Sequence, residues 1–137
     1  AVWHYWKPAW TAKDHPLAQR SRADDKPLSL AELCEVNCIL PGAKTFTRTL
    51  IGQRFEEVGL NLPVSMSTNY LETLKMMCGV GLGWSLLPEK MLDSELVALP
   101  VDTAPIHRPL GYLVHNNRTL SNAARKMIEQ LEANRET

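Results

Sequence analysis

Residues 67–88, STNYLETLKMMCGVGLGWSLLP, constrain the fold of this chain more than any other stretch. Leu71, Leu74 and Cys78 recur at helical spacing, which predicts a short amphipathic helix. Three glycines between Cys78 and Trp84 then break the helical pattern, and an apolar run resumes as a strand that stops at the final proline. The stretch therefore predicts a polar turn, a helix, a glycine-rich connection and a buried strand, with Trp84 in the core and not stacked on a ligand.

Polar residues precede this helix. Ser67, Thr68 and Asn69 stand where a helix N-cap belongs, and Glu72 lies three residues after Asn69, as in a capping box. A helix start with free backbone N–H groups and hydroxyls is also a common place to hold a small anion. Capping and ligand binding both remain open for these residues.

Helical and strand patterns alternate along the rest of the chain. The expected elements are an extended segment at 1–12, a polar loop at 19–26, a helix at 30–33 capped by Ser29 and Glu32, a strand at 36–40, a helix at 45–58, a strand at 63–67, a helical turn at 88–92, strands at 96–101 and 110–114, and a last helix from the cap Ser121 to about residue 133. This alternation predicts an α/β fold with a mostly parallel open sheet flanked by helices. In such sheets ligands bind beyond the carboxyl ends of the strands.

Two helices are assigned an inward face from their apolar residues. The expected faces are Phe46, Leu50, Phe55 and Val58 on the helix at 45–58, with Gly59 just past its end, and Ala124, Met127, Ile128 and Leu131 on the last helix.

A second polar helix start lies at residues 41–48, PGAKTFTR. Gly42, Lys44, Thr45 and Thr47 are candidate contacts, because a helix N-terminus with hydroxyls and the cations Lys44 and Arg48 suits a carboxylate or a sulfate-like group. The alternative is that Thr45 only caps the helix and that the two cations are solvated.

Composition and motifs exclude several classes of function. Lys plus Arg and Asp plus Glu number 15 each, so no net charge attracts DNA or an anionic membrane, and no apolar run approaches the ~20 residues of a membrane helix. The four histidines lack ligand spacing, and no nucleophile elbow, paired carboxylates or phosphate-binding glycine loop is present, so we expect no metal, no cofactor and no enzyme activity. The three cysteines are expected to be reduced, structural and buried, as in a cytoplasmic protein, and a redox pair is the less favoured alternative.

Five landmarks in a fixed order resemble LysR-type transcriptional regulators, in the C-terminal part of the effector-binding domain. They are GLGWSLLP at 81–88, DHPLA at 14–18, LSLAEL at 28–33, PGAKTFTRTL at 41–50, and RPLGYLV at 108–114 followed by LSNAA at 120–124. The resemblance covers nearly the whole chain, and the order of the landmarks makes it much more specific than any one of them.

The resemblance implies a type 2 periplasmic-binding-protein-like fold. Residues of about 15–107 would form the second subdomain, and residues 1–14 and 108–137 would supply the crossing strands and a remnant of the first subdomain. The domain would sense a small, anionic metabolite and modulate transcription in a homodimer or tetramer. Because the loop after the strand at 63–67 faces the effector in the family, the resemblance implies Thr68 as the best single contact. Operator DNA would be bound only through a helix-turn-helix domain that this sequence lacks, and no membrane would be involved.

Two alternatives share the fold. One is a solute-binding protein that delivers a small ligand to a transporter, which would carry a signal peptide upstream. The other is an enzyme of the prephenate-dehydratase kind, which would need a catalytic threonine and charged partners in the cleft. Free cysteines and the landmark matches favour the regulator.

Overall fold

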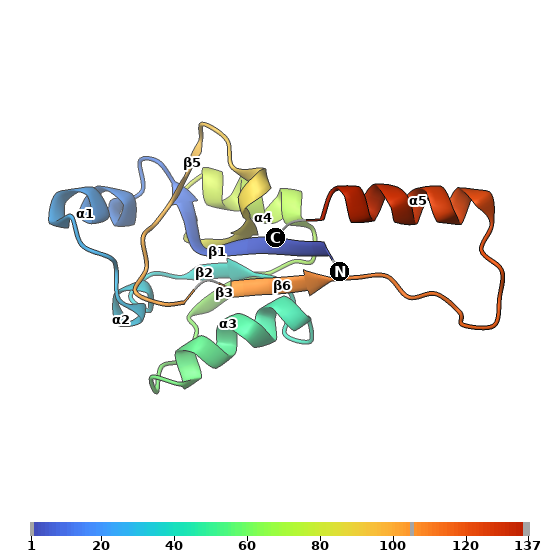
Figure 1. The fold of residues 1–137 in the computed structure, drawn as a ribbon. Helices are drawn as coiled ribbons and strands as arrows, with labels where there is room; N and C mark the ends of the chain where they lie inside the picture. Colours follow the sequence, from blue (N-terminus) through green and yellow to red (C-terminus); the bar gives the residue numbers. More distant parts are fainter. Residues whose placement is uncertain (1, 105, 136–137) are drawn as a thin grey trace. The chain divides into compact units, whose positions relative to one another are not determined.

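The computed structural model describes residues 2–104 and 106–135, with the backbone only for residues 2–8 and Arg108. Its elements are β1 (Val2–Ala12), α1 (Pro16–Asp24), α2 (Leu30–Leu33), β2 (Cys38–Leu40), α3 (Phe46–Glu56), β3 (Val64–Ser67), α4 (Leu71–Gly79), β4 (Ser85–Pro88), a 3₁₀ turn η1 (Glu89–Met91), β5 (Leu96–Ala98), β6 (Ile106–Leu110) and α5 (Asn122–Ala133) (Figure 1). Trp6–Ile106 forms one compact unit, and the two ends of the chain form the other.

The sheet of the Trp6–Ile106 unit is mixed. β2 and β3 are parallel, with Leu40 opposite Ser67, and a parallel bridge from Cys38 to Trp84 joins β2 to the start of β4. β1 runs antiparallel to both β4 and β5, and the single Cys38–Trp84 bridge joins this sheet to the β2–β3 pair in the order β3-β2-β4-β1-β5. The predicted α/β class is confirmed. The parallel arrangement holds for β2, β3 and β4, whereas the crossing strand β1 is inserted in the opposite direction.

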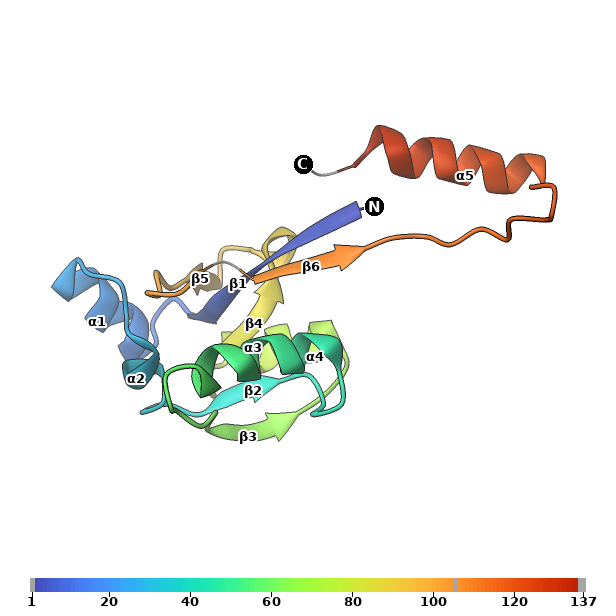
Figure 2. The ribbon, with the colours of Figure 1, turned by 60° about the horizontal axis from the view of Figure 1, so that its bottom comes forward.

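Helices α3 and α4 pack on opposite faces of β2. Cys38 and Leu40 lie in one core cluster with Ile51 and Phe55 of α3, while Ile39 between them lies in a second cluster with Leu74 and Cys78 of α4. This division follows from the strand geometry, because successive side chains of a strand point to opposite faces. Figure 2 shows α3 alongside β2 and β3, on the face that holds the first cluster.

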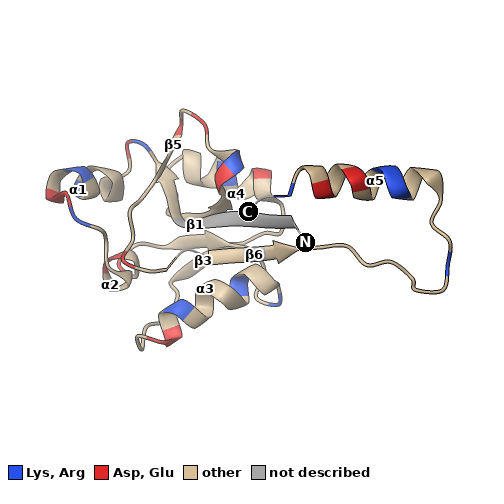
Figure 3. Ribbon diagram, viewed as in Figure 1, with Lys and Arg blue, Asp and Glu red and all other residues tan. Residues whose placement is uncertain are grey.

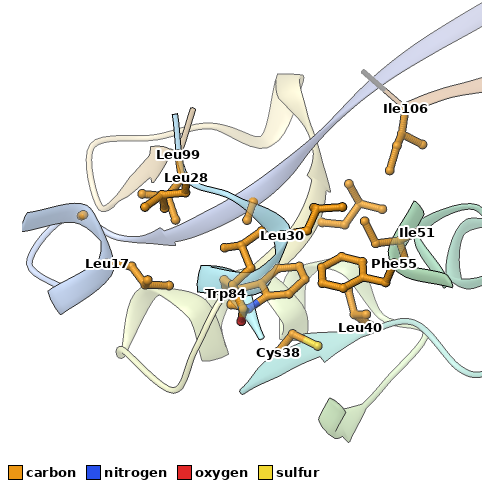
Figure 4. Close-up of a cluster of buried hydrophobic side chains, with 14 residues drawn as sticks. Leu17, Leu28, Leu30, Cys38, Leu40, Ile51, Phe55, Trp84, Leu99 and Ile106 are labelled. Atoms are coloured by element: carbon orange, nitrogen blue, oxygen red, sulfur yellow. Dashed lines mark hydrogen bonds between the residues drawn. The ribbon is translucent and has the colours of Figure 1, made fainter. Parts of the chain in front are cut away.

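Trp84 is the centre of the first cluster (Figure 4). Its side chain is fully buried, and its ring stacks on Phe55 with the ring centroids 5.9 Å apart. The indole N–H donates to the carbonyl oxygens of Leu33 at 3.0 Å and Val36 at 3.1 Å, so the polar atom of this large side chain is satisfied. The prediction that Trp84 belongs to the core is confirmed.

The glycine-rich connection lets β4 approach the chain before β2. A Cβ atom on Gly83 would lie 2.1 Å from the carbonyl oxygen of Asn37, and Gly81 has a φ of 87°. Glycine is required at residue 83 because a side chain has no space there, and at residue 81 because the backbone is left-handed.

The polar loop predicted at residues 19–26 is wrong, because α1 covers most of it. His15 is the N-cap, and its Nδ1 accepts a hydrogen bond from the Leu17 N–H at 3.1 Å, with Pro16 in the first turn. Only Leu17, Ala18 and Ser21 are buried in this helix, so the apolar signal was too sparse to reveal it.

The inward face predicted for the helix at 45–58 is partly wrong. The buried residues of α3 are Thr47, Ile51 and Phe55, at four-residue spacing, and Phe46 and Val58 are 54% and 57% exposed. The regular helix ends at Glu56, but the predicted role of Gly59 just past the end is confirmed: its φ is 73°, its N–H donates to the Glu56 carbonyl at 2.9 Å, and the Leu60 N–H donates to the Phe55 carbonyl at 2.9 Å.

At the C-terminal end of the chain, the capping role of Ser121 is confirmed, because its hydroxyl accepts from the Ala124 N–H at 3.1 Å. Met127 was expected to point inward but is 63% exposed, since it lies beside the half-buried stripe of Ala124, Ile128 and Leu131. The strand predicted at 110–114 is observed as β6 four residues earlier, and Gly111 follows its end.

Candidate functional site

The two polar loops singled out in the sequence meet at one edge of the sheet. One loop leads from β2 into α3, and the other leads from β3 into α4. Because β2 and β3 are parallel, their carboxyl ends lie side by side, and the N–H of Thr68 donates to the carbonyl of Leu40 at 3.2 Å across them. We call the residues 41–48 and 67–70 of these loops the strand-end site.

Asn69 joins the two loops. Its Oδ1 accepts a hydrogen bond from the Gly42 N–H at 2.9 Å, and a Cβ atom on Gly42 would lie 3.1 Å from that oxygen. The predicted capping box of Asn69 and Glu72 is wrong: Tyr70 is the N-cap of α4 and makes no side-chain capping bond. The physical reason is that α4 begins one residue later than predicted, so Asn69 precedes the N-cap and its side chain instead reaches the Gly42 N–H.

Thr45 is the N-cap of α3, as expected. Its hydroxyl oxygen accepts from the Arg48 N–H at 3.2 Å and its hydroxyl donates to the Gly42 carbonyl at 2.8 Å. Thr68 behaves similarly in the other loop, where its hydroxyl oxygen accepts from the Tyr70 N–H at 3.3 Å. Both threonine oxygens are therefore used to shape the loops.

Arg48 is half-buried and is not the solvated cation that one sequence interpretation assumed. Its Nη1 donates to the Pro41 carbonyl at 3.1 Å and lies 3.5 Å from the Ser67 hydroxyl. The guanidinium thus links the ends of β2 and β3. In the described part of the chain, no carboxylate lies within ion-pairing distance of it.

The structure brings six of the seven candidate residues to the surface of the strand-end site. Lys44, Ser67 and Asn69 are exposed, and Gly42, Thr45 and Thr68 are half-buried. Thr47 is 2% exposed, so its side chain is the one candidate that lies almost entirely below the surface, while its backbone N–H is in the first turn of α3. Sequence reasoning missed the link between Asn69 and Gly42, for which the glycine was the one available signal.

Hydrogen-bond donors dominate what this site offers to a ligand. The Asn69 NH₂ group makes no hydrogen bond within the described residues, and the first turn of α3 leaves backbone N–H groups without helical acceptors. The Lys44 ammonium group and the positive end of the α3 dipole add to them. An arrangement of donors and cations can hold a carboxylate, phosphate or sulfate group.

None of the three cysteines belongs to the strand-end site. Cys38 and Cys78 are fully buried, and desolvation raises the pKa of each thiol to about 12. They lie in clusters on opposite faces of the sheet, so they do not form a pair that could be joined. Cys34 is half-buried, and its Sγ lies 3.4 Å from the Asn61 carbonyl oxygen. The expectation of buried cysteines is confirmed for Cys38 and Cys78.

Charges of both signs are interspersed along the described elements (Figure 3). Within residues 2–104 and 106–135, no three His, Cys, Asp or Glu side chains gather closely enough to hold a metal ion. None of the helices in the same ranges has the length and apolar content to cross a membrane.

Comparisons with known proteins agree with this architecture. The family model of the LysR substrate binding domain matches residues 9–136. No curated protein sequence matches the chain. Similar solved structures include a putative LysR family transcriptional regulator from Pseudomonas aeruginosa (21% identity, TM-score 0.69, 94% of this chain and 44% of that chain) and the CcmR regulatory domain from Synechocystis in complex with 2-PG (22% identity, TM-score 0.74, 96% and 63%).

A third similar structure is the effector binding domain of QuiR in complex with shikimate (16% identity, TM-score 0.68, 93% of this chain and 59% of that chain). This chain therefore spans about half to two thirds of the chains that it resembles. At these identities the structural likeness establishes the fold, a periplasmic-binding-protein-like α/β arrangement. Together with the family model over residues 9–136, it leads to one assignment: the chain belongs to the LysR substrate-binding domain family.

Proposed function

We propose that this chain is the sensing part of a LysR-type transcriptional regulator and that it holds the anionic group of a small metabolite at the strand-end site. The contacts would come from the Asn69 amide, the hydroxyls of Ser67 and Thr68, the Lys44 ammonium group, and the backbone at Gly42, Thr45 and Thr47. Binding would change how subunits of the regulator are arranged, and through that change would modulate transcription.

The observation that carries this proposal is the hydrogen bond from the Gly42 N–H to Asn69 Oδ1 at 2.9 Å. It links the two loops and orients the Asn69 amide, whose NH₂ group makes no hydrogen bond within the described residues and can donate to a ligand. The CcmR and QuiR domains, solved with 2-PG and shikimate, support the view that this fold carries small-molecule sites.

The rest of the proposal concerns the whole regulator. We propose that it acts in the cytoplasm as a homo-oligomer and reaches operator DNA through a helix-turn-helix domain. The balanced charge of this chain, with 15 basic and 15 acidic residues, supports assigning DNA binding to another domain.

The test is an isosteric substitution, Asn69→Asp, which keeps an oxygen for the Gly42 N–H but removes the donors and adds a negative charge. Two-dimensional NMR titrations with shikimate, 2-PG and sulfate would follow the amides of Gly42, Thr45 and Thr68. We expect at least one probe to shift these amides in the unmodified chain and to lose roughly tenfold or more of its affinity in Asn69→Asp, since charge-assisted hydrogen bonds contribute about 1.5–3 kcal/mol.

Asn117→Asp, in the loop before α5, is the matched control, because Asn117 is exposed and undergoes the same change of charge. It should leave the titration unchanged. If every probe that shifts the loop amides binds Asn69→Asp as well as the unmodified chain, the donor role of Asn69 is refuted. If no anion shifts these amides, the anionic site itself is refuted.

A further inference from the structure

A groove beside α3 shares Ala43 and Arg48 with the strand-end site, and the proposed function assigns a ligand contact to neither of them. It has a volume of about 500 Å³ and runs between α3 and residues 60–62, which lead into β3. This volume is within the range of small-molecule sites. Arg48, Gly52 and Glu56 line it from the helix, and their four-residue spacing places them in one row along α3.

Gly52 is the anomalous residue in this groove. It lies in the middle of α3, where glycine is less stable than alanine because it loses more backbone freedom on folding. Packing does not require the glycine, since a Cβ atom there would meet nothing within 4 Å. The empty space beside Gly52 is part of the groove, so any larger side chain at this position would occupy it.

The ends of the row of helix residues carry opposite charges. Arg48 lies at one end and Glu56 at the other, and in the described residues neither side chain has an ion-pair partner of opposite charge. Leu60 and Leu62, both half-buried, add apolar surface to the lining of the groove. An unpaired guanidinium next to an apolar wall complements an organic acid, whose carboxylate can accept from the free guanidinium N–H groups.

We propose that this groove is a second small-molecule site, for a monocarboxylate with an apolar body, and that Arg48 is shared between it and the strand-end site. The carboxylate binds the Arg48 guanidinium and the apolar body lies over Gly52 against Leu60 and Leu62. Because Arg48 Nη1 also donates to the Pro41 carbonyl and lies near the Ser67 hydroxyl, a ligand in the groove acts on the ends of β2 and β3. The affinity of the strand-end site then depends on occupancy of the groove.

Benzoate is the probe, and neutral benzamide of the same shape is its control. In a two-dimensional NMR titration of this chain, millimolar benzoate should shift the amides of Gly52, Leu60 and Leu62. Benzamide should bind roughly tenfold more weakly, because it lacks the charge that pairs with Arg48. Arg48→Gln should weaken benzoate by a similar factor, whereas Arg54→Gln on the same helix should not.

Gly52→Leu should abolish the benzoate shifts by filling the groove, and Gly52→Ala, which favours the helix, should weaken them without unfolding the chain. Gly79→Ala is the matched control, since it is also a helical glycine with nothing within 4 Å of the added Cβ. Benzoate shifts that survive Gly52→Leu in a folded protein would overturn the proposal, as would the absence of any shift in the groove. Benzoate shifts confined to Gly42, Thr45 and Thr68 would also overturn it, while leaving the proposed function intact.

Discussion

Replacing Gly83 by alanine should cost this fold a large part of its stability, although the change adds a single methyl group. The new Cβ would lie 2.1 Å from the carbonyl oxygen of Asn37 and 3.1 Å from its carbonyl carbon. Both are backbone atoms, so no side chain can rotate away and the two chain segments must separate.

The magnitude follows from what holds these segments together. The Trp84 N–H donates to the Asn37 carbonyl at 3.2 Å, and the Ile39 N–H donates to the Trp84 carbonyl at 2.9 Å. Losing both hydrogen bonds costs about 1 kcal/mol each, and forcing an extra carbon into a packed core costs about 1–3 kcal/mol. We therefore expect Gly83→Ala to lower the free energy of unfolding by about 3–5 kcal/mol, against the ~5–15 kcal/mol that stabilises a typical domain.

The assay is urea unfolding followed by tryptophan fluorescence, which reports on the buried indoles of Trp10 and Trp84. With a slope of ~1–3 kcal/mol per molar urea, the midpoint should fall by roughly 2 M. Gly79→Ala is the matched control, because an added Cβ there meets nothing within 4 Å, and it should leave the midpoint unchanged or raise it. A midpoint for Gly83→Ala equal to that of the control would refute the steric reasoning.

Three further predictions concern buried or capping groups. Ser85 Oγ is buried with no well-formed hydrogen bond in the described part of the chain, and the Cys78 sulfur beside it is only a weak acceptor for the Ser85 hydroxyl. Ser85→Ala should therefore raise the free energy of unfolding by about 1 kcal/mol in the same urea assay, and a loss of stability would contradict this. Burial lowers the pKa of His15 below 6.5, and a protonated ring cannot accept from the Leu17 N–H. The stability that this cap contributes should therefore be present above pH 6.5 and be lost as the pH falls below 6.5. His15→Asn, which caps without titrating, should flatten this part of the stability curve. Desolvation raises the pKa of Cys38 and Cys78 to about 12 from 9.0, so both thiols should resist alkylation at pH 8 in the folded chain and react in urea. Because the unfolded chain loses these protons first, the free energy of unfolding should decline as the pH rises above 9.

Local signals predicted much of this fold. The capping box of Ser29 and Glu32, the cap at Ser121 and the strand that ends at Pro88 all follow from contacts within a few residues in sequence. Trp84 could be assigned to the core because a large apolar side chain after a glycine turn has few alternatives to burial. Short-range patterns of this kind can be recognised in the sequence because the interacting residues are separated by only a few positions.

Contacts between segments distant in sequence could not be predicted in the same way. Asn69 had a plausible local use as a helix cap, but its oxygen accepts from Gly42, which lies 27 residues earlier. The polar run after Pro16 looked like a loop because only Leu17, Ala18 and Ser21 of α1 are buried. The first error arose because a tertiary contact decided the role of Asn69, and the second because a helix that buries few residues gives little apolar signal.

The same contacts also limit the chemistry of the strand-end site. Among its polar groups, the oxygens of Thr45 and Asn69 accept backbone N–H groups of this chain, and the Pro41 carbonyl accepts from Arg48. These oxygens already hold two loops and two strand ends together. The Asn69 NH₂ group and the Lys44 ammonium group make no hydrogen bond or ion pair within the described residues, and this excess of donors and positive charge is why we propose an anionic effector and not a cationic or purely apolar one. Asn69→Asp replaces a donor by a negatively charged acceptor with almost no change in shape. A loss of anion binding in this variant would therefore be due to the changed polarity of the site and not to altered packing.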